Sequence, residues 1–141
     1  MKPKINIVTI GTPHFEKMLS FYKDSLGWQT KADAKSGIAF FDLSGLVFAV
    51  CDLKVLGDDI RQKLNGTTPS HITLAQNLSS EDEVKLAFEK IAKSGARIVK
   101  APQKADWGGF SGYFADPDGN LWEIAYNPFF HFDKNDNLIL P

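Results

Sequence analysis

The stretch GYFADPDGNLWEIAYNP, residues Gly112–Pro128, decides the fold of this 141-residue chain. Its centre, residues 116–119 (DPDG), has the composition of a tight turn, in which proline fixes one φ angle and glycine accepts a positive one. The flanking segments, Gly112–Ala115 and Asn120–Tyr126, are rich in apolar and aromatic residues, as is typical of strands. The sequence therefore predicts a β-hairpin whose second strand carries one carboxylate, Glu123.

Glu123 is unusual in this strand because an unpaired carboxylate is costly to bury. Three interpretations are open: a metal ligand, a general base, or a residue at a solvated strand end. The first two need partner groups from other strands, so the order of the remaining elements matters.

The first half of the chain predicts a strand, a helix and three more strands. The strand Lys4–Thr12 is β-branched and mostly apolar. The helix begins near Pro13, carries apolar residues at helical spacing and ends at Gly27. The three strands that follow are Trp28–Ala32, Ile38–Leu43 and Leu46–Asp52.

The second half predicts the same order again, and such an internal repeat determines the fold. Its first strand is Ser70–Asn77, and its helix is capped by Ser79 or Ser80 and ends at Gly95. The strand Ala96–Lys100, a loop over residues 102–109 and the hairpin complete it. A polar connector over residues 54–69, with a possible short helix, separates the halves, and the tail is a loop with an apolar end at residues 138–140.

Composition excludes several classes of function. The net charge of −1 gives no basic excess, so nucleic acid is not expected as a partner. No apolar run approaches a membrane span or a signal peptide, and Cys51 is the only cysteine, so no intramolecular disulfide can form. These features predict a cytoplasmic protein with no membrane partner.

The doubled order, the hairpin and the phrase SFYKDSLGW in the first helix together resemble the vicinal oxygen chelate superfamily. That group includes glyoxalases, bleomycin-resistance proteins and extradiol dioxygenases. The resemblance covers residues 4–128 and implies an α+β fold, in which two tandem β-α-β-β-β modules form an open barrel-like cleft, and a homodimer. We expect one glyoxalase/bleomycin-resistance-like domain over residues 1–141. Its parts are module one (about 4–53), a connector (about 54–69), module two (about 70–127) and a tail (128–141).

The resemblance also implies where a metal would bind, on the cleft face of the first and last strands of each module. Since alternate side chains of a strand share a face, His71 and Glu123 take these positions in the second half. The matching positions of the first half hold Ile7 and Phe48, which cannot bind a metal. A catalytic metal normally has three protein ligands, so the sequence predicts no cofactor, with a divalent metal on His71 and Glu123 as the alternative.

Other interpretations of these residues remain open. His71 and Glu123 could pair as a general base or as a polar anchor for a ligand, or His71 could simply be a solvated residue at a strand start. Trp107 and Phe110 flank two glycines, and they form either a wall of the cleft or a cap on the core. Cys51 is expected to face a helix and to be buried and inert.

Two functions follow from these expectations. The first is binding of a small molecule, without a complete metal site, in an aromatic cleft lined by Ile7, Phe48, His71, Trp107, Phe110 and Glu123. The second is a metal-dependent glyoxalase-type lyase or isomerase acting on a vicinal-oxygen substrate, with the metal as Lewis acid. A metal-free enzyme that uses Glu123 or His71 as a base lies between them.

Overall fold

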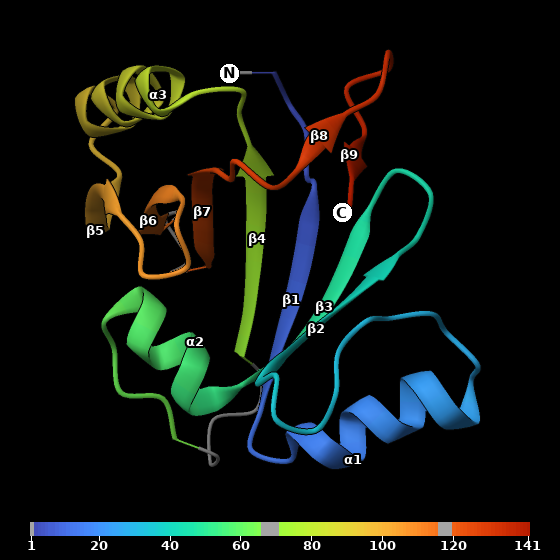
Figure 1. Cartoon of the computed structure of the whole chain (residues 1–141). Coiled ribbons are helices and arrows are strands. Elements are labelled where there is room, and N and C mark those ends of the chain that lie inside the picture. The colour runs from blue at the N-terminus through green and yellow to red at the C-terminus, as the bar shows by residue number, and fades with distance from the viewer. Residues whose placement is uncertain (1, 66–70, 116–119) are drawn as a thin grey trace.

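The computed structural model of the chain describes residues 2–65, 71–115 and 120–141 (Figure 1). Its elements are, in chain order, β1 (Ile7–Thr12), α1 (Phe15–Ser20), the π-helical turn η1 (Phe21–Ser25), β2 (Ile38–Asp42), β3 (Val47–Asp52), α2 (Leu53–Ile60), β4 (His71–Asn77), α3 (Glu81–Lys93), β5 (Arg97–Lys104), β6 (Phe110–Ala115), β7 (Leu121–Tyr126), β8 (His131–Phe132) and β9 (Leu138–Ile139). No helix in the described part of the chain is long and apolar enough to span a membrane.

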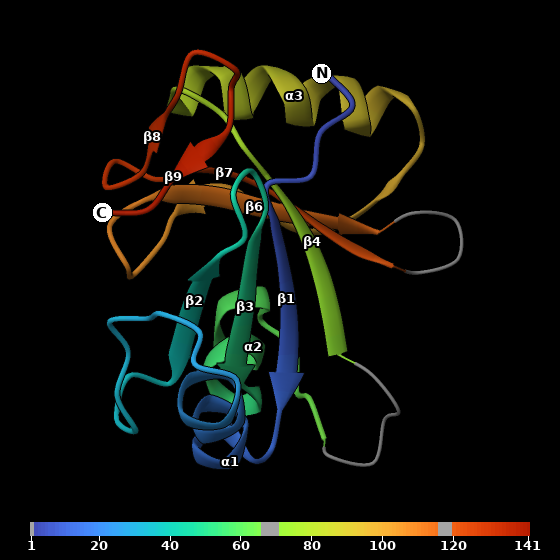
Figure 2. The same ribbon diagram turned by 90° about the vertical axis from the view of Figure 1, so that its right-hand side faces the viewer.

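Within the described residues, seven strands form one open sheet in the order β2-β3-β1-β4-β7-β6-β5. The two halves of the chain meet where β1 and β4 pair in antiparallel fashion, with Ile7 opposite Ala75. Inside each half the first strand is parallel to the last, β1 to β3 and β4 to β7. The sheet is strongly twisted, so that β6 and β7 run across the direction of β1 and β3 (Figure 2). The predicted α+β class and doubled module are confirmed.

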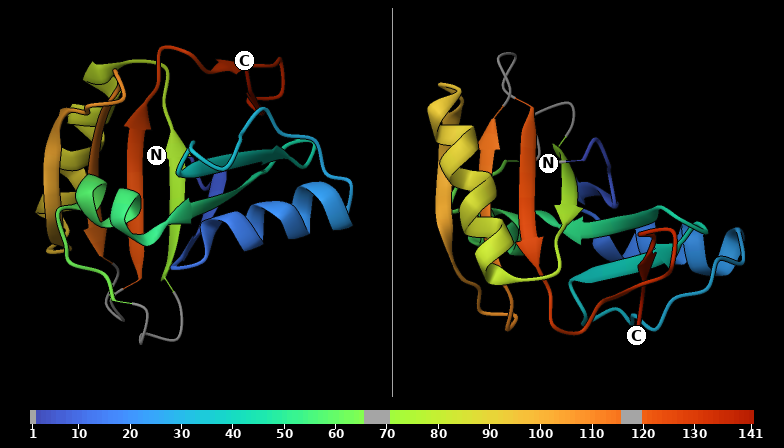
Figure 3. Two further views of the ribbon diagram at one scale, coloured as in Figure 1. Left: turned by 60° about the horizontal axis from the view of Figure 1, so that its bottom comes forward. Right: turned by 90° about the horizontal axis from the view of Figure 1, so that it is seen from above.

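The two faces of the sheet are covered by different segments. On the outer face, α1 packs through Phe15 and Leu19, and α3 packs through Val84 and Phe88. The inner face carries α2, the helix of the connector, so that α2 and α3 lie on opposite sides of the sheet (Figure 3). The tail also lies on the inner face, where Leu138 packs in one buried cluster with residues of β1, β3 and β4.

The ends of the helices have local causes. Asp52 caps α2, because its side chain accepts a hydrogen bond from the Lys54 N–H, and Arg61 ends that helix in a left-handed conformation. Ser80 caps α3 through the Glu83 N–H, as one of the two predicted caps. Gly95 follows α3 with φ +83, the conformation that favours glycine after a helix.

Three predicted elements differ in the structure. The strand Trp28–Ala32 does not form, because the Trp28 ring is held in an aromatic cluster beside Tyr22 and residues 29–32 border the cavity without pairing to the sheet. The strand predicted to end at Lys100 continues to Lys104; it tolerates Pro102 because β5 is an edge strand. The tail contains the small β8–β9 hairpin instead of a plain loop. The hairpin turn at residues 116–119 and the strand start at Ser70 lie outside the described residues.

Candidate functional site

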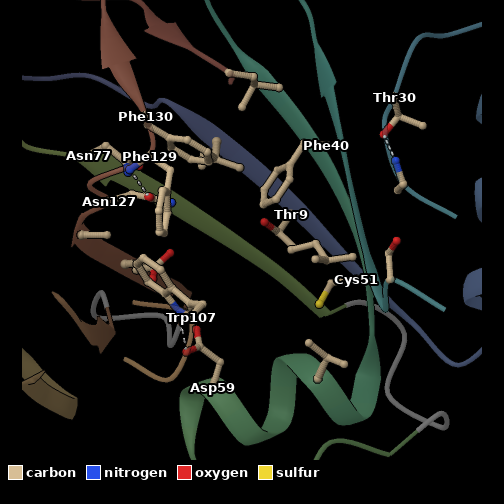
Figure 4. Close-up of a pocket in the computed structure, with 18 of the residues that line it drawn as sticks. Thr9, Thr30, Phe40, Cys51, Asp59, Asn77, Trp107, Asn127, Phe129 and Phe130 are labelled. Atoms are coloured by element: carbon tan, nitrogen blue, oxygen red, sulfur yellow. Dashed lines mark hydrogen bonds between the residues drawn. The ribbon is translucent and has the colours of Figure 1, made fainter. Parts of the chain in front are cut away.

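A cavity of about 860 Å³ lies on the inner face of the sheet, between α2 and the tail (Figure 4). Five segments supply its walls: strands of the sheet, the loop before β2, the connector helix, the loop before β6 and the tail. Most of its surface is apolar, and a small number of polar side chains interrupt it. The lining residues that matter for its chemistry are Ile7, Thr9, Phe40, Cys51, Asp59, Thr73, Asn77, Trp107, Tyr113, Glu123, Phe129 and Phe130.

The strand register places the polar groups of the sheet on this face. Ile7 of β1 pairs with Ala75 of β4, which in turn pairs with Glu123 of β7. Thr9 and Thr73 pair with each other one step further along the same strands. Because paired residues point to the same face, Glu123 and Ile7 both line the cavity, on the face that the alternation of the sequence predicts.

His71 lies elsewhere. It pairs with Gly11, four residues along β4 from the Ala75 that pairs with Glu123, which is about 13 Å at roughly 3.3 Å per residue. Its ring Nε2 donates a hydrogen bond of 2.8 Å to the backbone oxygen of Asn65. Among the described residues that line the cavity, His71 does not occur. The expected pair of His71 with Glu123 is therefore wrong.

Phe48 was predicted on the cleft face and lies on the opposite one. In the parallel pairing of β1 with β3 it stands opposite Val8, so it shares the outer face, where its ring packs 4.9 Å from that of Tyr22. Cys51 correspondingly lies on the cavity side, where it packs against Leu56 and Ile60 of α2, as expected of a residue that faces a helix. It is buried, and this burial raises the pKa of its thiol to about 12, so it is inert as a nucleophile.

Trp107 and Phe110, which flank the two glycines of the loop before β6, lie in different parts of the structure. Trp107 lines the cavity, and its ring covers Gly109 so closely that a Cβ there would lie 1.8 Å from it. The Trp107 Nε1 donates a hydrogen bond of 3.3 Å to Asp59 (Figure 4). Phe110 instead belongs to β6 and packs in the core beneath α3, so its expected place in the cleft is wrong.

Asp59 is the residue of this site that sequence reasoning missed. It lies on α2, and its Oδ2 accepts a hydrogen bond of 2.6 Å from the Tyr113 hydroxyl. The buried Lys100 ammonium donates to the Asp59 backbone oxygen at 2.9 Å and lies 3.5 Å from its Oδ1. The sequence predicts this polar segment as a connector between the halves and not as part of the cleft wall. The available signal was its spacing from Leu56, since residues three apart share a helix face.

The electrostatics of the cavity centre on Glu123. Burial raises the pKa of its carboxyl from 4.5 to about 7, and the neighbouring Asp59 carboxylate acts in the same direction. The Ser111 hydroxyl, the Lys100 ammonium and the Tyr113 hydroxyl oppose this shift. None of the ion pairs between described residues includes Glu123. Near neutral pH this side chain therefore exchanges readily between the acid and the carboxylate.

The donor set around Glu123 does not fit a three-ligand divalent metal. The matching position on β1 is the apolar Ile7, His71 is remote, and the nearby Asp59 already accepts from Tyr113 and Lys100. The described ranges of the chain hold no cluster of three or more histidine, cysteine, aspartate or glutamate side chains that could bind a metal ion. The site offers two carboxylates and a lysine ammonium in place of a histidine-rich ligand set.

Comparisons with known proteins agree with the fold. The model of the Glyoxalase/Bleomycin resistance protein/Dioxygenase superfamily matches residues 4–124. The metallothiol transferase FosB of Lysinibacillus sphaericus (strain C3-41) is 30% identical over 120 residues, which cover 85% of this chain and 79% of that protein.

Solved structures show the same fold. An NAD-dependent benzaldehyde dehydrogenase from Legionella pneumophila has a TM-score of 0.67 at 19% identity, over 86% of this chain and 97% of that one. The Mn(II)-bound glyoxalase from Novosphingobium aromaticivorans has a TM-score of 0.61 at 20% identity, over 87% of this chain but 38% of that one.

Proposed function

Since this chain belongs to the glyoxalase/bleomycin resistance protein/dioxygenase superfamily, we propose that it binds a small molecule in the cavity on the inner face, without a complete metal site. The observation that carries this proposal is the cavity itself. Its volume of about 860 Å³, its apolar walls and its few converging polar groups are the features of ligand pockets in general.

The polar groups are arranged so that they could hold the polar part of a small molecule, and they do not have the arrangement of metal ligands. Glu123 lines the cavity, and Asp59 and Tyr113 lie near it on two other elements. A buried Lys100 ammonium already takes the place near Asp59 that a metal cation would need. The aromatic rings of the tail and of the loop before β6 supply contact surface for the body of a ligand.

Proton transfer is a second candidate function, and the pKa of Glu123 favours it. A carboxyl with a pKa of about 7 is suited to act as a general base or acid at neutral pH. In this form the protein would be a metal-free lyase or isomerase on the scaffold of its superfamily. The metal-dependent alternative draws on relatives such as the Novosphingobium glyoxalase, which binds Mn(II). Turnover of a substrate in the presence of a chelator separates these possibilities.

We expect that added metal does not stabilise the protein. Thermal melts with a chelator and with zinc, nickel, manganese or iron(II) should agree within about 1 °C, because only a ligand that binds the folded state raises the melting temperature. Elemental analysis of protein purified without an affinity tag should find far less than one equivalent of any of these metals. A rise of several degrees with one ion, together with stoichiometric metal, would contradict the metal-free site.

Ligand binding is expected to change the fluorescence of Trp107, because its ring lines the cavity. A screen of aromatic compounds against the protein would therefore report binding as a shift or quenching of tryptophan emission. In Trp107→Phe the change should shrink strongly while calorimetry still detects the ligand, since Trp28 and Trp122 are not among the described lining residues. If no compound of any charge gave a signal by either method, the proposed function would be wrong.

A further inference from the structure

We propose that the ligand of this cavity is an organic ammonium, an apolar body with a protonated amine, and that its nitrogen pairs with Glu123. This inference rests on the proposed function and names the chemical class of its ligand. Three separate features of the cavity support it: its charge balance, an acceptor without a donor, and its aromatic walls.

Among the described side chains around Glu123, the negative charges outnumber the positive charges by one. The Asp59 carboxylate lies close enough to Glu123 to raise its pKa, and the Lys100 ammonium lies 3.5 Å from Asp59 and lowers that pKa. Asp59 is already satisfied by Tyr113, Trp107 and Lys100. Among the described residues, two further charged side chains line the cavity, Lys31 and Asp42, and their charges cancel. A single positive charge on a ligand would neutralise the site, and a negative one would add to its repulsion.

The second feature is a side-chain oxygen of the cavity wall, on Asn77, for which the described residues supply no hydrogen-bond donor. Asn77 lines the cavity and is only 7% exposed, yet its side-chain oxygen has no hydrogen-bond partner among the described residues. Buried acceptors are nearly always paired in folded proteins. The hydroxyls of Thr9 and Thr73 face the same space and can accept as well. An ammonium group, which has N–H donors and no acceptor, can donate to these oxygens.

The aromatic walls suit a cation. Phe40, Trp107, Phe129 and Phe130 all border the cavity (Figure 4), and the rings of Phe40 and Phe130 meet edge to face at 5.9 Å. The face of an aromatic ring attracts a positive charge, most strongly where water is excluded. These rings therefore reduce the cost of transferring an ammonium from water, and they contact the apolar part of the same ligand.

The test uses three probes that share one body and differ in charge: 2-naphthylmethylamine, 2-naphthylmethanol and 2-naphthylacetate. Calorimetry at pH 8 should show the cationic amine binding at least about tenfold more tightly than the alcohol, since a hydrogen bond to a charged group is worth about that factor or more. The acetate should bind most weakly. Glu123→Gln should remove the preference for the amine, whereas the matched control Glu89→Gln, at an exposed site on α3, should keep it.

The affinity for the amine should also depend on pH. It should fall about tenfold from pH 8 to pH 6, because Glu123 takes up a proton as the pH falls through about 7. The groups that face Glu123 are Asp59 of α2, Lys100 of β5 and Tyr113 of β6. The fall should be absent from Glu123→Gln, which assigns it to that side chain.

Several outcomes would overturn the inference. Tighter binding of the alcohol or the acetate than of the amine would reject the ammonium class and still support a small-molecule cavity. Failure of all three probes to bind would reject the class and count against the proposed function as well. An amine preference that survives in Glu123→Gln would show that another group holds the nitrogen. If that variant did not fold, Asp59→Asn, which removes the charge that raises the pKa of Glu123, should move the fall in amine affinity to lower pH, and an unchanged pH dependence would reject the inference.

Discussion

Glu123→Gln is expected to raise the free energy of unfolding at pH 8 by about 3 kcal/mol, because the ionised carboxylate is costly in its half-buried place beside Asp59. The pKa of this group is about 7 in the folded chain against an ordinary value of 4.5. A difference of one pKa unit corresponds to about 1.4 kcal/mol. The amide keeps the shape of the side chain and removes the charge that must be desolvated. Substitutions that stabilise a protein at its binding site commonly weaken its function.

The sign of the pH dependence follows from the same values. Between pH 4.5 and 7 the folded state holds a proton on Glu123 that the unfolded state has released. The contribution of this group to stability is therefore complete below about pH 4.5 and is lost as the pH rises to about 7. Urea unfolding at pH 5 and pH 8 should show a smaller difference for Glu123→Gln than for the wild type. Equal stability of the two proteins at pH 8, with Glu89→Gln as control, would contradict the raised pKa.

Lys100→Met is expected to lower the free energy of unfolding by about 3 kcal/mol, since it removes one partner of a largely buried ion pair. The Lys100 side chain is 5% exposed, and its ammonium donates to the Asp59 backbone oxygen as well as facing its carboxylate. Without it, two carboxylates would share the cavity with no cation between them. The pKa of Glu123 should then rise further, because Lys100 is one of the groups that lower it.

The controls for this prediction come from the same strand. Lys104→Met removes a more exposed ion pair, with Glu81, and should cost less than about 1 kcal/mol. The double variant Lys100→Met with Asp59→Asn should recover part of the lost stability, because the unpaired negative charge is gone. Chemical unfolding of the four proteins measures both effects. A loss for Lys100→Met no larger than that for Lys104→Met would show that the pair with Asp59 is unimportant.

The sequence predicts the second half of the site better than the first, and the reason lies in the strands. The strand of Glu123 follows a clear turn, and its neighbours differ enough in polarity to indicate which side faces the cleft. The strand Leu46–Asp52 is apolar on both faces, because both are buried, so its alternation carries no information about orientation. An error of one position there exchanged Phe48 for Cys51 in the predicted cavity wall.

Asp59 and His71 show a different limit. In the polar connector, only the spacing from Leu56 sets Asp59 apart from the adjacent Asp58, and the packing of α2 turns Asp59 towards Tyr113. His71 has the right face for the site and the wrong distance, since the register that separates it from Glu123 by four residues depends on how β4 and β7 align. Alternation determines the face of a residue but not its position along the strand.

The antiparallel contact of β1 with β4 has a consequence for the order of folding. The partners Ile7 and Ala75 are far apart in the chain, whereas each half closes its own sheet over a shorter loop. Because long loops close slowly, we expect each half to gain structure before the halves join. The cavity takes Thr9 from one half and Glu123 from the other. Recognition of a ligand would therefore belong to the last step of folding, and a bound ligand would slow the first step of unfolding.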